Sequence, residues 1–342
     1  MSRRLIALFI LIALCCGSAA AQLTTQQKAE NLDAFEKVWT RVRDRHPDPK
    51  LNGLDWQKIH DQTRPLIEKA QSMDEVRRIL RDMLAKLESS HYAIIPAERY
   101  TEKPEGARTP DAATTARPPE GFGQITPEGV LVRFGNLPET RLSFDAHALA
   151  DGAGYIRFNE FLEPGSIMPQ IEAALKTFHD APGVILDLRG NPGGIGIMAM
   201  GIAGFFIDKP GQSLGEMTMR DTTLKFVIFP RPETYKGPLA ILVDGGSAST
   251  SEILAGGLQD LKRARIFGTR TAGAVLPSDI IRLPNGDGFQ YAQAGYTSTG
   301  GRVLEGTGVT PDVEVRQTEE ARSDGRDLVL DAADDWIRST HP

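Results

Sequence analysis

Cysteine is nearly absent from this sequence, with only Cys15 and Cys16 among its 342 residues. Both lie near the N-terminus, in a segment that we expect to be removed. A mature chain without them has no disulfide bond, no thiol nucleophile and no thiolate metal site. Its stability must come from an apolar core, and the length suffices for one large domain or two modest ones.

The chain is also poor in aromatic residues (7%), has no long basic run, and carries a formal net charge of −6. Proteins that bind nucleic acid usually show a basic patch, often with aromatic residues. These absences argue against nucleic acid as a partner. The sequence also contains no H-E-x-x-H pattern, so we expect neither a metal ion nor another cofactor.

No hydrophobic run is long enough to span a membrane, which needs about 20 residues. The longest, residues 5–14, follows Arg3 and Arg4 and precedes small residues that end at Ala21. A charged start, a short apolar run and an A-x-A site are typical of a secretory signal peptide. We therefore expect residues 1–21 to be cleaved and the mature chain to be secreted or periplasmic, without a stable membrane span. A lipid anchor on one of the two cysteines is the alternative.

Residues 22–98 are predicted to form a helical domain. Apolar residues recur at helical spacing in three stretches, and His46-Pro47 ends the first of them. Asp55 is placed to cap the second, and Ser72 with Glu75 forms a capping box for the third. Residues 99–150 are predicted to contain a linker rich in Pro, Thr, Ala and Gly, followed by short strands.

Residues 151–320 alternate between apolar strands and helices. Buried strands are predicted at 184–188 and 239–243, each followed by a helix, and 280–292 has the pattern of a hairpin. This alternation favours an α/β domain with a largely parallel sheet that helices cover on both faces. A last helix and tail are predicted within 321–342, so the whole chain is an α+β arrangement of a helical domain and a sheet domain.

Ser249 lies where a buried strand turns into a helix, in the run Gly246-Ser247-Ala248-Ser249-Thr250. Reacting groups gather at the carboxyl ends of parallel strands, and helix N-termini stabilise developing anions. Ser249 is thus a candidate nucleophile. Its spacing from Glu252 is also that of a capping box, so this segment alone favours a helix cap over a nucleophile.

A glycine-rich turn follows the other buried strand, in the run Arg189-Gly190-Asn191-Pro192-Gly193-Gly194. Glycines allow backbone N–H groups to approach an anion. The spacing matches neither phosphate-loop pattern. An oxyanion hole and a plain turn remain as readings of this segment.

Two further segments contain candidate residues for proton transfer. Ser90-His91 follows the third predicted helix, and a histidine is the usual general base for a serine nucleophile. Glu305 lies in a glycine-rich turn, where it could orient a partner of that base. Each residue is also compatible with an ordinary structural or solvent-exposed role.

In combination and in this order, the four segments resemble the C-terminal processing (tail-specific) peptidase family, which includes the tricorn core protease. The resemblance runs from about residue 86 to 315, and the Leu-Asp-Leu-Arg-Gly-Asn-Pro-Gly-Gly and Gly-Ser-Ala-Ser runs are its most specific parts. It implies a catalytic domain of the ClpP/crotonase-like kind. It also implies Ser249 as nucleophile, with an oxyanion hole formed by the N–H groups of Gly193 or Gly194 and of Thr250.

The sequence departs from the better-known branch of that family, which pairs the serine with a lysine. Ala274 stands where the lysine would be. The tricorn-like branch uses a serine–histidine pair and a glutamate instead, and Ser90, His91 and Glu305 match this pattern. The resemblance therefore implies that His91 takes the proton of Ser249, that Ser90 holds the imidazole, and that Glu305 holds Ser90.

Many family members carry a PDZ domain before the catalytic domain, whereas residues 92–153 look too short for one. The short strands there would be a reduced substitute or a lid. The sequence thus predicts an exported serine endopeptidase that acts on peptides or proteins without a cofactor. A ligand-binding protein of the same fold and a serine hydrolase of small esters are the alternatives.

Overall fold

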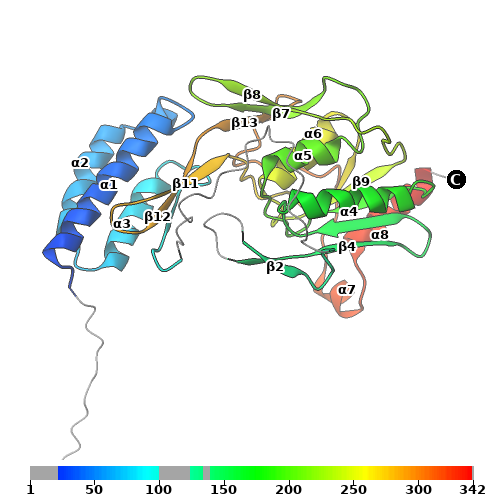
Figure 1. Cartoon of the computed structure of the whole chain (residues 1–342), viewed down its shortest axis with the longest axis horizontal. Helices are drawn as coiled ribbons and strands as arrows, with labels where there is room; N and C mark the ends of the chain where they lie inside the picture. Colours follow the sequence, from blue (N-terminus) through cyan, green and yellow to red (C-terminus); the bar gives the residue numbers. More distant parts are fainter. Residues whose placement is uncertain (1–21, 100–123, 134–138, 341–342) are drawn as a thin grey trace, which may run out of the picture.

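The computed structural model describes residues 22–99, 124–133 and 139–340. The predicted signal peptide at 1–21, the linker at 101–123 and the last two residues of the tail lie outside the described residues. Figure 1 shows a helical part at the N-terminal end and a larger sheet-containing part beside it.

The N-terminal part is formed by helices α1 (Thr25–Arg45), α2 (Trp56–Lys69) and α3 (Met73–Ala85), with a short 3₁₀ turn at Leu51–Gly53. The predicted caps are present: Asp55 accepts a hydrogen bond from the N–H of Lys58, and Ser72 accepts one from the N–H of Glu75. The chain leaves α1 at His46, directly before Pro47, as expected for a residue that precedes proline. None of the described helices is long and apolar enough to cross a membrane.

The central sheet has the strand order β14-β10-β9-β6-β5-β4. Its strands are β4 (Phe144–Ala148), β5 (Gly154–Phe158), β6 (Val184–Asp187), β9 (Leu239–Val243), β10 (Arg265–Gly268) and β14 (Val313–Glu314). All neighbours are parallel except the β4–β5 pair. Strand β4, which falls in the predicted 99–150 region, is therefore an edge strand of the central sheet.

Helices cover both faces of this sheet, because alternate strand residues are apolar on each side. Helices α4 (Pro164–Thr177), α5 (Gly196–Ala203) and α6 (Thr250–Asp260) pack with Leu186 and Ile241 in the larger core. Helix α8 (Leu328–Thr340) packs with Ile185 and Leu242 on the other face. A short helix, α7 (Glu319–Ser323), precedes α8. The predicted fold class, a helical N-terminal part with a mostly parallel α/β sheet, is confirmed.

The predicted hairpin is present, as β11 (Ser278–Arg282) and β12 (Gly288–Ala292). It pairs with β1 (Ala93–Ile95) and extends to the N-terminal helices (Figure 1). Leu283, Phe289 and Tyr291 belong to the same apolar core as the helices. At the hairpin turn, fully buried Asp287 forms a bidentate ion pair with Arg77 of α3. The helical core is thus completed by residues from far along the chain.

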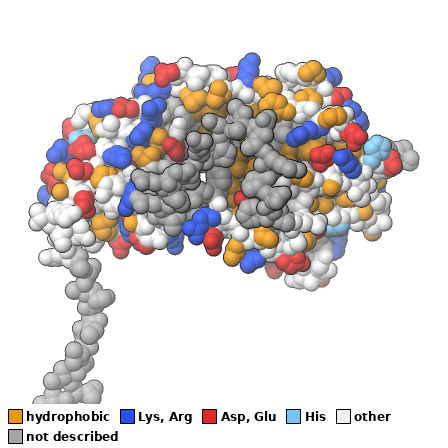
Figure 2. Space-filling model, viewed as in Figure 1, with side chains coloured by type: hydrophobic (Ala, Val, Ile, Leu, Met, Phe, Trp, Pro, Cys, Tyr) orange, Lys and Arg blue, Asp and Glu red, His pale blue; other side chains and the backbone are white. Residues whose placement is uncertain are grey.

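A second antiparallel sheet, with the order β13-β7-β8, packs against α5 and α6. Its strands are β7 (Ser213–Thr218), β8 (Thr223–Val227) and β13 (Gly295–Ser298). Figure 2 shows hydrophobic side chains along the upper rim near this sheet, where Leu224, Val227 and Phe229 are exposed. A separate pair, β2 (Val130–Val132) and β3 (Thr140–Leu142), precedes β4.

Candidate active site

Ser249 lies at the N-terminus of α6, which begins just beyond the fully buried strand β9. Its backbone has φ 53° and ψ −115°, outside the regions that residues with a side chain favour. Such a conformation costs about 1–3 kcal/mol and is found mostly at functional sites. The strand–turn–helix setting expected from the sequence is therefore present, and its backbone is strained at the serine.

Glu252, in the first turn of α6, is a fully buried carboxylate that organises the surrounding backbone. It accepts hydrogen bonds from the N–H of Ser249 at 3.0 Å and from the N–H groups of Gly273 and Ala274 at 2.8 and 2.9 Å. The hydroxyl of Thr271 donates to it at 2.5 Å. The capping-box spacing pointed to Glu252 only as a cap, whereas this carboxylate joins the Ser249 turn to the 271–274 segment.

The glycine-rich turn after β6 packs directly on the Ser249 turn. A Cβ atom built on Gly193 would lie 2.8 Å from both the Cβ of Ser249 and the backbone nitrogen of Thr250. Gly193 also has φ 99°, in the region that favours glycine. Only glycine fits this position, because a side chain would occupy the space beside the serine.

The two glycines differ in what their N–H groups do. The N–H of Gly193 donates to the side-chain oxygen of Asn191 at 2.9 Å. The carbonyl of Gly193 accepts a hydrogen bond from the N–H of Phe161. In a trans peptide N–H and C=O point in opposite directions, so the N–H of Gly194 points away from Phe161. Of the predicted pair, Gly194 is thus the glycine whose N–H has no hydrogen-bond acceptor among the described residues.

Ser90, His91 and Glu305 are joined by hydrogen bonds. The Oγ of Ser90 lies 2.6 Å from Nδ1 of His91 and 3.1 Å from Oε2 of Glu305. The N–H of Ser90 donates to Oε1 of Glu305 at 2.7 Å, and the N–H of Val275 donates to Oε2 at 3.1 Å. The structure therefore brings together three of the predicted residues from segments more than 200 positions apart.

These contacts define the direction of the hydrogen bonds when Glu305 is ionised. A carboxylate only accepts, so the hydroxyl proton of Ser90 goes to Glu305. The Oγ of Ser90 then accepts the proton on Nδ1 of His91. In a neutral imidazole this leaves Nε2 as the unprotonated nitrogen, which is the state that a general base requires. The tautomer follows from the hydrogen-bond network.

Residues 273–275 connect the two groups of candidate residues. The N–H groups of Gly273 and Ala274 bind Glu252, and the next N–H, that of Val275, binds Glu305. The carbonyl of Ala274 accepts a hydrogen bond from the N–H of Ser249 at 2.8 Å. Within the described residues no hydrogen bond joins His91 to Ser249. Catalytic hydrogen bonds are often long in free enzymes and tighten when substrate binds.

His91 is partly buried, and this burial affects its protonation. Burial lowers the pKa of His91, and the nearby charge of Glu305 opposes this shift. The neighbouring Tyr92 stacks on the ring of His46 with 5.9 Å between ring centroids. Burial also raises the pKa of the Tyr92 hydroxyl. His91 is thus held in a site that favours its neutral form.

The described residues contain no group of three or more His, Cys, Asp or Glu side chains arranged to hold a metal ion. The site consists of a hydroxyl, an imidazole, a carboxylate and backbone N–H groups. These groups support acyl transfer by a serine nucleophile.

Two family models match this chain. Residues 152–315 match peptidase family S41, and residues 27–85 match the tricorn protease C1 domain. The chain is 32% identical over 183 residues to a carboxy-terminal-processing protease of Bartonella bacilliformis. It is 33% identical over 184 residues to a carboxyl-terminal-processing protease of Synechocystis sp.. These regions cover 52% and 53% of this chain, but only 42% of each relative, so the chain spans less than half of their length.

Solved structures share the fold at low sequence identity. The photosystem II D1 C-terminal processing protease has a TM-score of 0.56 at 18% identity, covering 86% of this chain and 94% of that one. The tricorn protease has a TM-score of 0.60 at 16% identity, covering 92% of this chain and 37% of that one. The helical part and the sheet-containing part of this chain therefore occur together in known peptidase folds.

Proposed function

We propose that this chain, whose residues 152–315 match peptidase family S41, is an exported serine endopeptidase with Ser249 as its nucleophile. The observation that carries the proposal is the hydrogen-bonded Glu305–Ser90–His91 group, which the 273–275 segment ties to the strained Ser249 turn. A non-catalytic binding protein of this fold would need neither a strained serine at this helix start nor an oriented histidine.

In the proposed mechanism, the Oγ of Ser249 attacks the carbonyl carbon of the scissile peptide bond while Nε2 of His91 takes its proton. His91 then gives this proton to the leaving amine as the C–N bond breaks, which leaves an acyl ester on Ser249. His91 next takes a proton from water as the water attacks the ester, and returns it to Ser249. A positioned base of this kind contributes about 10²–10⁴-fold.

The N–H groups of Gly194 and Thr250 are proposed to stabilise the oxyanion. Thr250 is the first residue of α6, so its N–H has no acceptor within the helix and adds to the positive end of the helix dipole. The hydroxyl of Thr250 donates to the carbonyl of Gly194 at 3.0 Å, so the two residues are neighbours. Gly193 is assigned the supporting role of leaving space for the substrate carbonyl.

The substrates are proposed to be peptides or proteins, as for relatives named carboxy-terminal-processing proteases. Export and a periplasmic or secreted location are supported by the sequence of residues 1–21 alone. The proposal includes no PDZ domain in the 92–153 interval, which looks too short for one.

The nucleophile assignment is tested by labelling the purified mature chain with a fluorophosphonate probe. We expect one modified residue, Ser249, and complete loss of labelling in Ser249→Ala, with wild-type labelling in Ser339→Ala, which removes a hydroxyl from an exposed part of α8. Labelling of the folded protein at any other serine, or none at all, would contradict the assignment. Circular dichroism checks that Ser249→Ala is folded.

The reaction class is tested separately with matched substrates. A peptide library and a panel of small esters are incubated with wild type and with Ser249→Ala. Cleavage of internal peptide bonds that requires Ser249 supports the endopeptidase. Turnover of esters without any peptide cleavage would favour a small-ester hydrolase instead.

A further inference from the structure

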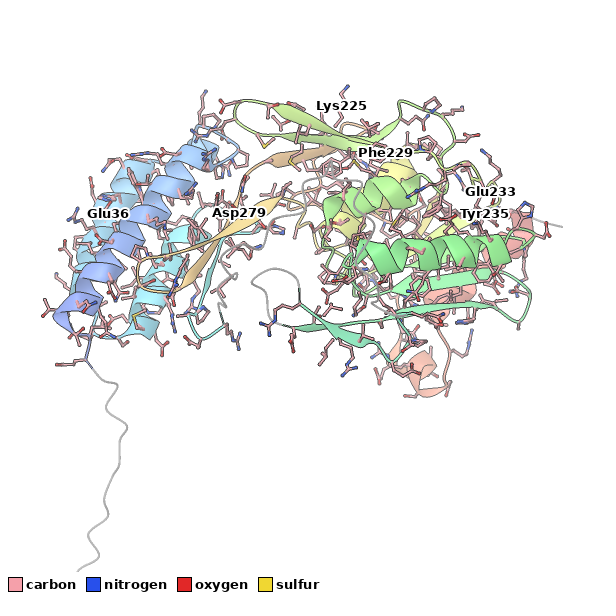
Figure 3. All side chains as sticks on the ribbon, viewed as in Figure 1. Glu36, Lys225, Phe229, Glu233, Tyr235 and Asp279 are labelled. Atoms are coloured by element: carbon pink, nitrogen blue, oxygen red, sulfur yellow. The ribbon has the colours of Figure 1, made fainter. Side chains whose placement is uncertain are left out.

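A pocket of about 680 Å³ lies between α4 and the loop 231–236, away from the candidate active site. Its wall combines apolar surface from Leu175, Phe205 and Tyr235 with basic side chains, among them Arg231 and Lys176. Figure 3 places Glu233 and Tyr235 beside one another at the end of the molecule opposite the N-terminal helices.

The side chain of Arg231 forms no hydrogen bond or ion pair with the described residues, and its Nε is buried without a partner. Its guanidinium lies over the ring of Phe205, 5.0 Å from the centroid. Buried polar groups in folded proteins are almost always hydrogen-bonded, and leaving a charged one without a partner is costly. An anion in the pocket would supply the acceptor that Nε of Arg231 lacks.

The neighbouring Arg263 shows what a structural arginine does in the same environment. It lies over the ring of Phe206 and donates to the backbone carbonyls of Phe206, Tyr235 and Gly237 at 2.8–3.0 Å. Burial is thus compensated at Arg263 by three carbonyl acceptors. In the part of the chain that the structure describes, Nε of Arg231 has no such acceptor.

The other basic side chains of the pocket have acidic partners. Lys176 binds Glu172 at 2.9 Å, Lys236 binds Asp208, and His179 contacts Asp180. Glu233 is an exposed acid at the rim. Arg231 remains as the one lining cation without an acidic partner among the described residues.

Hydrogen bonds of the backbone hold the loop that carries Arg231 in place. The N–H of Arg231 donates to the carbonyl of Gly204, and the N–H of Tyr235 donates to that of Phe205. The carbonyl of Arg231 accepts from the hydroxyl of Thr234 at 3.1 Å. The guanidinium is therefore presented by a fixed loop, as in a preformed binding site.

We propose that this pocket binds an organic carboxylate, with Arg231 holding the carboxylate group and Leu175, Phe205 and Tyr235 contacting an apolar body. Guanidinium and carboxylate form charge-assisted, often bidentate hydrogen bonds. The carboxylate belongs either to a free organic acid or to the C-terminus of a peptide. The site is independent of the proposed peptidase activity.

Calorimetric titration of the full mature chain tests the site with three probes: 3-phenylpropionate, a short peptide that ends in phenylalanine with a free carboxylate, and the same peptide amidated. We expect at least one of the free carboxylates to bind, and at least 10-fold weaker binding of the amidated peptide. Tighter binding of the small acid identifies a free organic acid as the ligand, and tighter binding of the peptide identifies a peptide tail.

Arg231→Met should weaken carboxylate binding at least 10-fold, whereas Arg316→Met, at an exposed arginine, should leave it unchanged. If Arg231→Met binds the carboxylates as tightly as wild type does, their binding site lies elsewhere, for example at Ser249. This result would overturn the proposal. Absence of binding by wild type would do the same. If Arg231→Met does not fold, the NMR signal of the Arg231 Nε–H in wild type should shift on titration, and no shift at saturation overturns the proposal.

Discussion

At the scale of single residues, the candidate active site is marked by strained backbone conformations. Ser249 and His91 both have positive φ angles, 53° and 63°, although neither is glycine. Each such conformation costs about 1–3 kcal/mol and persists only where the surroundings enforce it. At Ser249 the buried carboxylate of Glu252 provides this support, and at His91 the Ser90–Glu305 hydrogen bonds do so.

Glu305→Gln should lower the rate of Ser249 labelling about 10²–10⁴-fold. A glutamine amide can donate to the Oγ of Ser90, which then donates to Nδ1 of His91 and moves the imidazole proton to Nε2, the wrong nitrogen for a base. The change removes no carbon atoms and should leave the fold intact. Glu305→Asp retains the charge but shortens the reach, so partial activity is expected. A wild-type rate in Glu305→Gln would refute the proposed relay.

The pH dependence of the labelling rate should follow the protonation of His91. The ordinary pKa of histidine is 6.5, and burial lowers the pKa of His91 below it. The imidazole therefore stays neutral at pH 6.5, and the labelling rate should fall only at a lower pH. Glu305 raises this pKa, so its removal in Glu305→Gln should move the midpoint lower still. Rate–pH profiles of both proteins measure the two midpoints. A wild-type midpoint above 6.5 would mean that another group, or a charged environment, controls the step.

Gly193→Ala should abolish labelling while the chain stays folded, because the added Cβ would lie 2.8 Å from the Cβ of Ser249 and from the nitrogen of Thr250. Gly190→Ala is a matched control. Gly190 also has positive φ, 69°, but nothing lies within 4 Å of its built Cβ. Both variants carry the backbone penalty, so only the clash beside the serine separates them. Equal labelling rates in the two would contradict the packing described.

Sequence reasoning reached the residues whose signals are local. Ser249 and Ser90-His91 could be identified because each lies in a recognisable short segment. Asn191 and Val275 were not identified, and Glu252 was identified only as a cap, because their roles consist of hydrogen bonds to distant segments. A buried glutamate at a helix start looks the same in sequence whether it caps one helix or binds four donors.

At the scale of elements, the least predictable part was the β7–β8 ribbon. Its strands carry Thr, Ser, Glu and Lys and lack a clear alternation, so neither strand was predicted. At its turn, Arg220 donates through Nε to the carbonyl of His46 at 3.0 Å and through a terminal nitrogen to that of Arg43. These carbonyls end α1, where a cation is favoured. The ribbon thereby contacts the helical part beside the Tyr92 segment.

Arg220→Ala should reduce the labelling rate about 10- to 100-fold, because small displacements of a reacting group have effects of this size. The loss of its hydrogen bonds should cost only about 1 kcal/mol of stability. Arg220→Lys keeps the charge at the end of α1 and should restore part of the rate. Arg316→Ala, at an exposed arginine, is the control. If Arg220→Ala labels at the wild-type rate, the ribbon contact does not position His91.

For the whole molecule, the two parts cannot be separated along the sequence. The sequence pattern correctly identified the three helices and the hairpin. It gave no sign that Phe289 and Tyr291 of the hairpin belong to the core of the helices, since periodicity reports which face is apolar and not which partner covers it. The site has the same construction, with Ser90-His91 from the helical part and Ser249 and Glu305 from the sheet part.

This construction predicts that the mature chain unfolds as one cooperative unit. Phe289 is fully buried in the helical core, and Phe267 is 1% exposed in the core between the sheet and α8. Truncating either to alanine should cost about 3–5 kcal/mol. If the parts unfold together, Phe289→Ala and Phe267→Ala should lower the midpoint of the same single thermal transition, followed by circular dichroism and by loss of Ser249 labelling. If Phe289→Ala instead produces an early transition that leaves the later one at its wild-type position, the helical part unfolds independently. The shared core would then not couple it to the sheet.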